Sequence, residues 1–256
     1  MDVKGLLIDL DGVLYVGDTA IAGAQAAVDW IKDQGYRFRF VSNTTRKCRS
    51  TIVKRLRRMG FTIDEATIFT PPLAAVAWMR EAGKNRCMLL TTGDVNKDFE
   101  QWCENGGSSG PVDYVVVGDA GEDMTYENLT RALRFLNSGA GLIALEKDRF
   151  WMAPDGLALS AGPFVAALEF ATGKSADVMG KPSPRFFGMA LRDMGLSPDE
   201  AAMIGDDIIT DIAGAKNAGM QAILVRTGKF TEAALDATAI KPDFVIDTIA
   251  DLSEIL

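Results

Sequence analysis

Seven short apolar runs alternate along the chain with segments of helical periodicity, and this alternation is what most restricts the possible fold. The runs are continuously apolar, which is typical of strands buried on both faces of a sheet. The predicted strands are Leu6–Leu10, Phe38–Ser42, Met88–Thr91, Tyr114–Val117, Leu142–Leu145, Ala202–Ile204 and Ala222–Val225. Helices are predicted to begin near Ala24, Arg46, Leu73, Asn128, Pro163, Pro184, Ile208 and Thr231. This rhythm predicts an α/β fold with helices on both faces of parallel sheets.

Length and charge narrow the class of protein. The chain has 256 residues, 48% of them hydrophobic, and a formal net charge of −8. There is enough chain for one large core or two smaller ones. An acidic chain argues against nucleic acid or an anionic membrane as the main partner. No apolar run reaches the roughly 18 residues of a transmembrane helix, and the N-terminus lacks the layout of a signal peptide. Three scattered cysteines predict no disulfide framework and favour a cytoplasmic location.

Basic residues gather between Arg46 and Arg58, which raises the question of a nucleic-acid site. Apolar residues recur among them at helical spacing, namely Cys48, Ile52, Leu56 and Met59. That spacing favours an amphipathic helix with a solvated cationic face over a nucleic-acid patch.

The chain contains no histidine. Catalysis by Ser-His-Asp or Cys-His groups is therefore excluded, and so is a zinc site with histidine ligands. If the protein carries out acid–base chemistry near neutral pH, carboxylates are the groups expected to do it.

Polar residues stand at four places where the predicted sheet would end or a helix would begin. They are Asp9 and Asp11; Ser42, Asn43 and Thr44; Lys181, ahead of Ser183 and Pro184; and Asp206, Asp207 and Asp211. Each group taken alone could simply cap the following helix. In an open parallel sheet, however, ligands bind beyond the carboxyl ends of the strands. We therefore expect these groups to meet at one edge.

Three carboxylates at one edge, those of Asp9, Asp11 and Asp206, would repel one another unless a cation lay between them. Ligands that offer only oxygen suit Mg²⁺. The hydroxyl and amide groups of Ser42 and Asn43, a helix N-terminus and the Lys181 ammonium are groups that hold phosphate. The residues by themselves thus predict a magnesium site facing a phosphate site.

Four motifs carry a resemblance to a known family. They are DLDGVLY at 9–15, SNTT at 42–45, GKPSP at 180–184 and GDDIITD at 205–211. In order and spacing they resemble the haloacid dehalogenase (HAD) superfamily of aspartate-nucleophile phosphatases, subfamily IIA. The resemblance extends over essentially the whole chain. It implies a Rossmann-like, doubly wound parallel core in residues 1–72 and 178–256, with an inserted α/β cap domain of the C2 type in residues 73–177.

The resemblance also implies a mechanism. Asp9 would attack phosphorus and form an aspartyl-phosphate, and Asp11 would act as acid and then as base. Their spacing fits, because side chains two residues apart on an extended segment point to the same side. The remaining implied roles are Mg²⁺ binding by Asp9, the backbone carbonyl of Asp11, and Asp206; support of the metal's waters or of Lys181 by Asp207 and Asp211; and phosphoryl binding by Ser42, Asn43 and Lys181.

The expected substrate is a small phosphorylated metabolite, because a large cap would exclude bulky molecules. Three other functions compete with this one: an inert binding protein on the same fold, a phosphotransferase with the same aspartyl-phosphate, and a dehalogenase. The presence of Asp11 counts against the first and the third. Related phosphatases form dimers through their caps, so a homodimer is a further expectation. The turns at 155–156 and 160–162 could face the active site or be ordinary hairpin corners.

Overall fold

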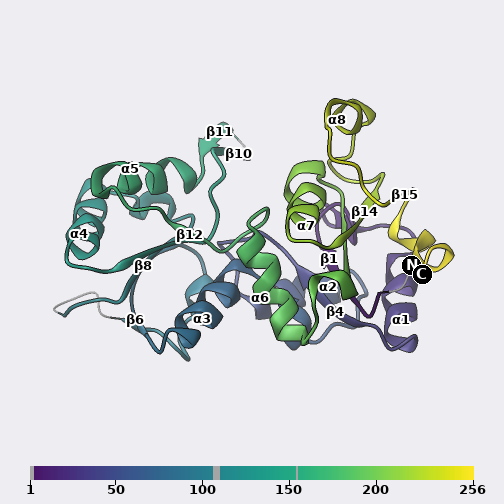
Figure 1. The fold of residues 1–256 in the computed structure, drawn as a ribbon, viewed down its shortest axis with the longest axis horizontal. Coiled ribbons are helices and arrows are strands. Elements are labelled where there is room, and N and C mark those ends of the chain that lie inside the picture. Colours follow the sequence, from purple (N-terminus) through teal and green to yellow (C-terminus); the bar gives the residue numbers. More distant parts are fainter. Residues whose placement is uncertain (1–2, 106–109, 154) are drawn as a thin grey trace. The chain divides into compact units, whose positions relative to one another are not determined.

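The computed structural model describes residues 3–105, 110–153 and 155–256, and the chain folds into two compact units (Figure 1). Unit 1 comprises Met1–Ser42, Ser50–Phe69 and Lys181–Leu256, and unit 2 comprises Asn43–Arg49 and Thr70–Gly180. The sequence predicts a core in 1–72 and 178–256 and a cap in 73–177. The assignment of a catalytic role to one unit and a capping role to the other stays a prediction.

Unit 1 is built on a six-stranded sheet in the order β15-β14-β13-β1-β4-β5. All neighbouring strands run parallel, so their carboxyl ends lie along one edge. At the centre of the sheet, Ile8 of β1 pairs with Ile204 of β13 and with Phe40 of β4. The strands are β1 (Gly5–Asp9), β4 (Arg37–Val41), β5 (Ile68–Phe69), β13 (Ala201–Gly205), β14 (Gln221–Val225) and β15 (Phe244–Ile246).

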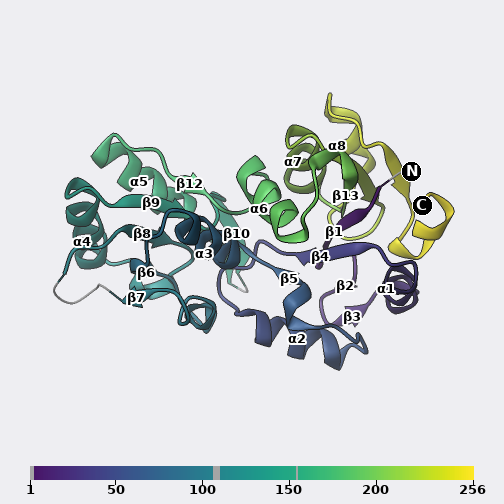
Figure 2. The ribbon, with the colours of Figure 1, turned by 60° about the horizontal axis from the view of Figure 1, so that its bottom comes forward.

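Helices cover both faces of this sheet (Figure 2), as alternating strands and helices predict. On one face α1 and α2 bury Val28, Ile31 and Leu56 against the strand residues Leu6 and Ile8. On the other face α6 packs its Phe186 ring against Phe69, with ring centroids 5.5 Å apart. The helices are α1 (Ala24–Asp33), α2 (Arg49–Arg58), α6 (Pro184–Met194), α7 (Gly214–Asn217) and α8 (Glu232–Ala237), and a small hairpin, β2 (Tyr15–Val16) with β3 (Thr19–Ala20), follows β1.

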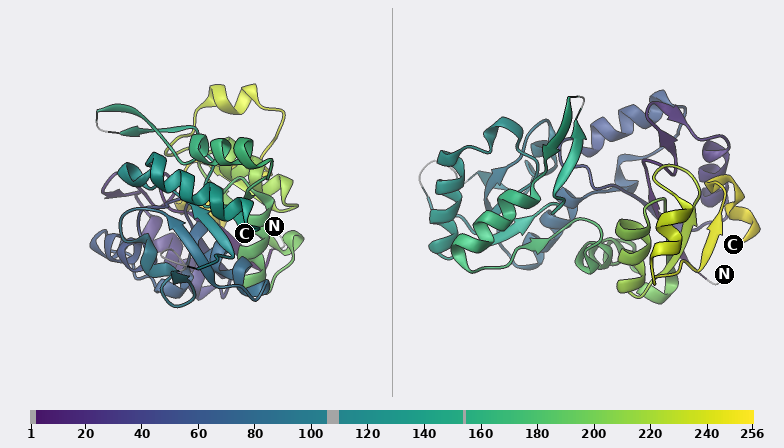
Figure 3. Two further views of the ribbon diagram at one scale, coloured as in Figure 1. Left: turned by 90° about the vertical axis from the view of Figure 1, so that its left-hand side faces the viewer. Right: turned by 90° about the horizontal axis from the view of Figure 1, so that it is seen from above.

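Unit 2 has its own parallel sheet, in the order β12-β9-β8-β6-β7, with a core formed by residues such as Val115, Leu136, Leu142 and Val165. Its strands are β6 (Arg86–Leu90), β7 (Glu104–Asn105), β8 (Tyr114–Val117), β9 (Gly141–Ala144) and β12 (Asp177–Val178), and its helices are α3 (Pro71–Glu81), α4 (Tyr126–Asn137) and α5 (Gly162–Thr172). An antiparallel hairpin, β10 (Phe150–Ala153) with β11 (Gly156–Leu159), projects from the rest of unit 2 (Figure 3). The turn at 155–156 is thus a hairpin corner.

All seven predicted strands are present, and the α/β class is confirmed. The strands that the pattern missed are β2, β3, β5, β7, β10, β11, β12 and β15. Six of them have two or three residues, too few to produce an apolar run, and the other two, β10 and β11, have four residues each and form a largely exposed hairpin. Within the described residues, no helix is both long and apolar enough to cross a bilayer.

One helix starts later than predicted, and another starts where predicted but as a different type of helix. Helix α2 begins at Arg49 and not near Arg46, because the Asp94 and Asp98 carboxylates accept the backbone N–H groups of Cys48 and Arg49 and cap the helix there. Those carboxylates come from a distant part of the chain, so no local pattern could indicate them. The helix expected from Ile208 begins as a π-helix, Ile208–Ala213, and continues as α7.

Candidate active site

The carboxyl ends of the two central strands of unit 1 bring three acids together. Asp9 is the last residue of β1, Asp206 follows β13 directly, and Asp211 lies in the π-helix that comes next. One carboxylate oxygen of each lies within 4.8 Å of those of the other two. The meeting of Asp9 and Asp206 is what the sequence predicts. The third member of the cluster is Asp211, whereas the Asp11 side chain is exposed.

Lys181 is buried against this cluster, with 5% of its surface exposed. Its Nζ lies 2.8 Å from Asp9 Oδ1 and 2.7 Å from Asp211 Oδ1. It stands at the start of α6, where the Ser183 hydroxyl accepts the Arg185 N–H and caps the helix. Of the residues predicted to bind phosphate, Lys181 is thus in direct contact with the acids.

Ser42 and Asn43 stand at the junction between the two units. Ser42 directly follows β4 in unit 1, while Asn43 belongs to unit 2, where its side chain lies next to Gly180. Both side chains are half-buried. A shared role for them in binding phosphate stays a prediction.

Burial makes the acids of the cluster hard to ionise. It raises the pKa of Asp206 to about 6 and that of Asp211 to about 6, and it raises the pKa of Asp9 even though Lys181 opposes the shift. For Lys181, burial alone would lower the pKa, but the Asp211 and Asp9 carboxylates outweigh it and raise the value. The buried Lys181 ammonium therefore contacts Asp9 and Asp211, while Asp206 is held by the Lys229 backbone N–H.

The cluster fits a hard divalent cation. Its three carboxylates offer oxygen ligands close together, and a cation there would offset charge that one ammonium leaves unbalanced. Oxygen-only sites of this size suit Mg²⁺. Asp9, Asp206 and Asp211 are the side chains that could hold it.

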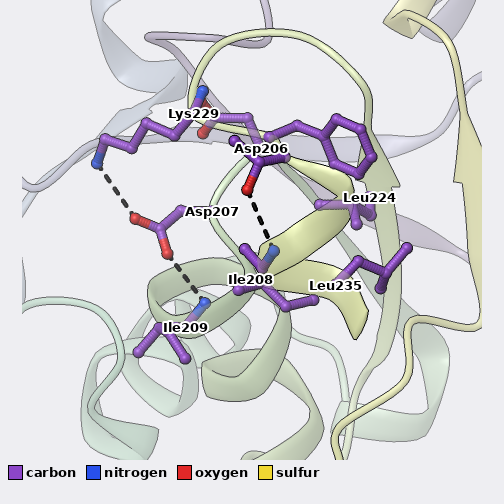
Figure 4. Close-up of a pocket in the computed structure, with 10 residues that line it drawn as sticks. Asp206, Asp207, Ile208, Ile209, Leu224, Lys229 and Leu235 are labelled. Carbon is purple, nitrogen blue, oxygen red and sulfur yellow. Dashed lines mark hydrogen bonds and ion pairs between the residues drawn. The ribbon is translucent and has the colours of Figure 1, made fainter. Parts of the chain in front are cut away.

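Asp207 faces a different set of groups, as Figure 4 shows. Its Oδ1 accepts the backbone N–H groups of Ile209 and Thr210, and its Oδ2 lies 3.2 Å from Lys229 Nζ. Burial would raise the pKa of Asp207, but these hydrogen bonds and Lys229 outweigh it and lower the value. Asp207 therefore caps the π-helix, the alternative that the sequence left open for this residue.

Sequence reasoning missed the loop after β14. There the Lys229 N–H donates to Asp206 Oδ2 at 2.7 Å, and the Thr227 hydroxyl donates to the Gly12 carbonyl. A signal was available, because the polar segment Arg226-Thr227-Gly228-Lys229 follows the predicted strand Ala222–Val225 directly. Beside this loop lies a cavity of about 220 Å³, which Asp206 and Asp207 line together with apolar residues including Ile208, Leu224, Phe230 and Leu235 (Figure 4).

Two glycines leave room for the Asp206 carboxylate. A Cβ added to either Gly12 or Gly228 would lie 2.0 Å from Asp206 Oδ2, and at Gly228 it would also lie 2.5 Å from the Gly12 Cα. Both have positive φ, 84° at Gly12 and 62° at Gly228. The loops after β1 and β14 thus close around Asp206 in a way that other residues would prevent.

We expect Gly228→Ala to weaken Mg²⁺ binding at the candidate site about 10- to 100-fold, because the methyl group would displace the Asp206 carboxylate, one of the candidate ligands. The measurement is titration calorimetry with Mg²⁺. Gly35→Ala is the matched control. Gly35 also has positive φ, 76°, but its added Cβ would meet nothing within 4 Å. It should lose only about 1–2 kcal/mol of stability through backbone strain and keep its metal affinity. Equal affinity in the two variants would contradict the prediction.

Comparisons with known proteins agree with the resemblance that the motifs predict. Residues 6–102 match the family model of the haloacid dehalogenase-like hydrolases, and residues 178–252 match a second HAD-hydrolase-like model. Human phospholysine phosphohistidine inorganic pyrophosphate phosphatase is 39% identical over 99% of this chain and 94% of its own length. Human haloacid dehalogenase-like hydrolase domain-containing protein 2 is 42% identical over 94% of this chain and 90% of its own length.

Solved structures show the same likeness. The p-nitrophenyl phosphatase from Archaeoglobus fulgidus superposes with a TM-score of 0.89 at 30% identity, over 100% of both chains. The 4-nitrophenylphosphatase from Thermotoga maritima has a TM-score of 0.87 at 30% identity, over 99% of this chain and 97% of that one. The match to these curated relatives extends over nearly the whole chain. The chain is therefore an enzyme that belongs to the haloacid dehalogenase-like hydrolase family.

Proposed function

We propose that the protein is a Mg²⁺-dependent phosphatase that hydrolyses small phosphate monoesters, or related phosphoryl compounds, through an aspartyl-phosphate. The observation that carries the proposal is the contact of the Asp9 carboxylate with buried Lys181, inside a cluster of acids at the carboxyl end of β1. A carboxylate at such a place can act as a nucleophile, and the ammonium beside it can receive phosphoryl charge. The relatives that are named as phosphatases support the reaction class.

Each residue then has a task. Asp9 attacks phosphorus, and its Oδ forms a bond as the bond to the leaving oxygen breaks. Asp11 gives that oxygen a proton, and later takes one from the water that cleaves the aspartyl-phosphate. Lys181, Ser42 and Asn43 bind the phosphoryl oxygens.

The metal site completes the proposal. Asp9, Asp206 and the backbone carbonyl of Asp11 would hold Mg²⁺, and the place of Asp211 in the cluster adds it as a further candidate ligand. When bound, the ion neutralises charge on the phosphoryl group. Asp211 also keeps Lys181 in place, because its Oδ1 lies 2.7 Å from Lys181 Nζ and its side chain is fully buried.

The experiment that tests this function is the release of p-nitrophenol from p-nitrophenyl phosphate, with Mg²⁺ and then with EDTA. We expect turnover with Mg²⁺ and a loss of at least about 100-fold with EDTA, the size expected when several kcal/mol of charge stabilisation are removed. Equal rates in both buffers would contradict the metal dependence. If the pure protein turned over no small phosphate ester and did not bind beryllium fluoride as a mimic of the aspartyl-phosphate, the alternative of an inert binding protein would hold.

The substrate is proposed only by class, a small phosphorylated metabolite. A phosphotransferase would share every step up to the aspartyl-phosphate and differ in the acceptor alone. The cap role of unit 2, a homodimer and a cytoplasmic location stay predictions.

A further inference from the structure

The chain after Asp11 folds back on itself before it enters the rest of the unit. The Gly12 N–H donates to the Tyr15 carbonyl at 2.7 Å, and Asp11 and Tyr15 form an isolated β-bridge. Tyr15 then begins the hairpin of β2 and β3. The backbone position of Asp11 therefore depends on where Tyr15 is held.

The hairpin is too small to hold itself. Each of its strands has two residues, Tyr15–Val16 and Thr19–Ala20, and a hairpin of that size has little stability of its own in water. Its tip is exposed at Gly17 and Asp18. A contact from another part of the chain is needed to fix it.

Arg55, from helix α2, supplies such a contact from 37 to 40 residues away in the sequence. Its Nη2 donates to the Gly17 carbonyl at 2.7 Å and to Asp18 Oδ1 at 3.2 Å. Its guanidinium carbon lies 4.6 Å from the centre of the Tyr15 ring, and Nη1 reaches the Tyr15 hydroxyl at 3.5 Å. One planar group thus holds the first residue and the tip of the hairpin together.

The two groups that Arg55 connects, its own helix and Tyr15, are anchored in the core of unit 1. Ile52 and Leu56, which flank Arg55 by three residues and by one, are buried in the core of unit 1. Tyr15, on the other side, is 6% exposed. The neighbouring basic residues make other contacts or face solvent: Arg57 donates to the Ile63 carbonyl, and Arg58 is exposed.

We propose that Arg55 is a positioning residue for the reaction: by clamping the β2–β3 hairpin it fixes Tyr15, and through the Tyr15 bridge it fixes the backbone of Asp11. The inference rests on the proposed function, since it gives Asp11 the role of acid. The proposal gives a role to Arg55, one of the basic residues between Arg46 and Arg58 that are otherwise interpreted as a solvated helix face.

The consequence concerns the leaving group. A misplaced Asp11 matters little for p-nitrophenyl phosphate, whose leaving group departs as a stable anion without a proton. It matters for phenyl phosphate, because its leaving group is a less stable anion than that of p-nitrophenyl phosphate and so depends more on receiving a proton. The quantity to compare is kcat/KM, which covers the steps up to the formation of the aspartyl-phosphate and so isolates the acid step from the later hydrolysis.

The experiment compares Arg55→Gln with Arg58→Gln, a matched change on the same helix. For Arg55→Gln we expect kcat/KM to fall about 10- to 100-fold with phenyl phosphate, part of the usual effect of a general acid, and less than about 3-fold with p-nitrophenyl phosphate. Arg58→Gln should change neither. Arg55→Lys should resemble Arg55→Gln, because an ammonium cannot reproduce the forked contact. Full activity of Arg55→Lys would overturn the clamp, since charge alone would then suffice.

Asp11→Asn separates this inference from the proposed function. If it lowers the phenyl phosphate rate selectively while Arg55→Gln does not, the Arg55 inference is wrong and the function stands. If Asp11→Asn has no selective effect, the role of Asp11 as acid is wrong, and with it the reaction role given to Arg55.

Hydrogen exchange tests the clamp itself without any turnover. In Arg55→Gln the amides of Gly12 and Leu14 should exchange at least about 10-fold faster than in wild type, while those of β1 stay unchanged. Unchanged exchange at Gly12 would overturn the inference. A uniform rise across unit 1 would show general destabilisation and would also count against it. Arg55→Lys should show the same faster exchange at Gly12 and Leu14, because its ammonium loses the forked contact.

Discussion

Replacement of Asp9 by asparagine is expected to abolish turnover without loss of stability. The amide cannot form the bond to phosphorus, so the rate with p-nitrophenyl phosphate should fall at least roughly 1,000-fold. The fold should persist because Lys181 keeps its second partner, Asp211 Oδ1, at 2.7 Å. Asparagine also matches aspartate in size.

The expected effect on stability has a definite sign. Burial raises the pKa of Asp9, so its ionised form is less favourable in the folded chain than in the unfolded chain. At neutral pH without metal, the neutral amide removes that cost and one of three crowded negative charges. The melting temperature in EDTA should therefore be equal to or above that of wild type.

The control is Asp29→Asn, which also removes one negative charge, but from a side chain on α1 that is 64% exposed. It should keep activity within about 3-fold, in line with a surface change. Substantial turnover by Asp9→Asn would refute the assignment of the nucleophile. A large drop in its melting temperature would refute the account of the charge balance.

Lys181→Met is the second substitution with a large expected effect, and it should lower stability as well as activity. Removal of the ammonium leaves Asp9 and Asp211 buried without their cation, which should cost about 3–5 kcal/mol at neutral pH in EDTA. Lys229→Met is the matched control. Lys229 also pairs with an aspartate, at 3.2 Å, but its side chain is 72% exposed, so the loss should stay below about 1 kcal/mol.

This loss should depend on pH in one direction. The pKa of Asp211 and that of Asp206 are already raised to about 6, and without Lys181 the pKa of Asp211 rises further. A carboxyl with a raised pKa binds its proton more tightly in the folded than in the unfolded chain. Stability from these groups therefore falls as pH rises from about 4 through the folded pKa.

At about pH 5 these carboxyls in Lys181→Met are largely protonated and need no cation. We expect the difference between Lys181→Met and wild type to be at most about half as large there as at about pH 7.5. Denaturant unfolding in EDTA at both pH values measures it. A difference that was the same at both, or larger at the lower pH, would show that the carboxylates are not what Lys181 stabilises.

The parts of the fold that depend on local pattern could be predicted from the sequence. Apolar runs of four or five residues are long enough to identify strands such as β1 and β13, and Ser183-Pro184 marks the start of α6 without further information. Because parallel strands end at one edge, the polar residues after them had to share that edge. The meeting of Asp9 and Asp206 follows from this rule, whereas Lys181 precedes α6 and follows no strand of this sheet.

Contacts across the chain had to come from the tertiary structure. The motif GDDIITD contains three acids, and the turn geometry decides their contacts. Asp211 contacts Lys181, whereas Asp207 accepts the backbone N–H of Ile209 at the start of the π-helix. Lys229 reaches Asp206 because β14 lies beside β13, and Arg55 reaches Tyr15 because α2 packs under the hairpin. Strand order and packing bring such residues together, and the few residues around each one do not indicate which distant partner it meets. The sequence by itself therefore determined the seven longer apolar strands, the motifs and the family, whereas the tertiary structure decided which charges are paired and buried.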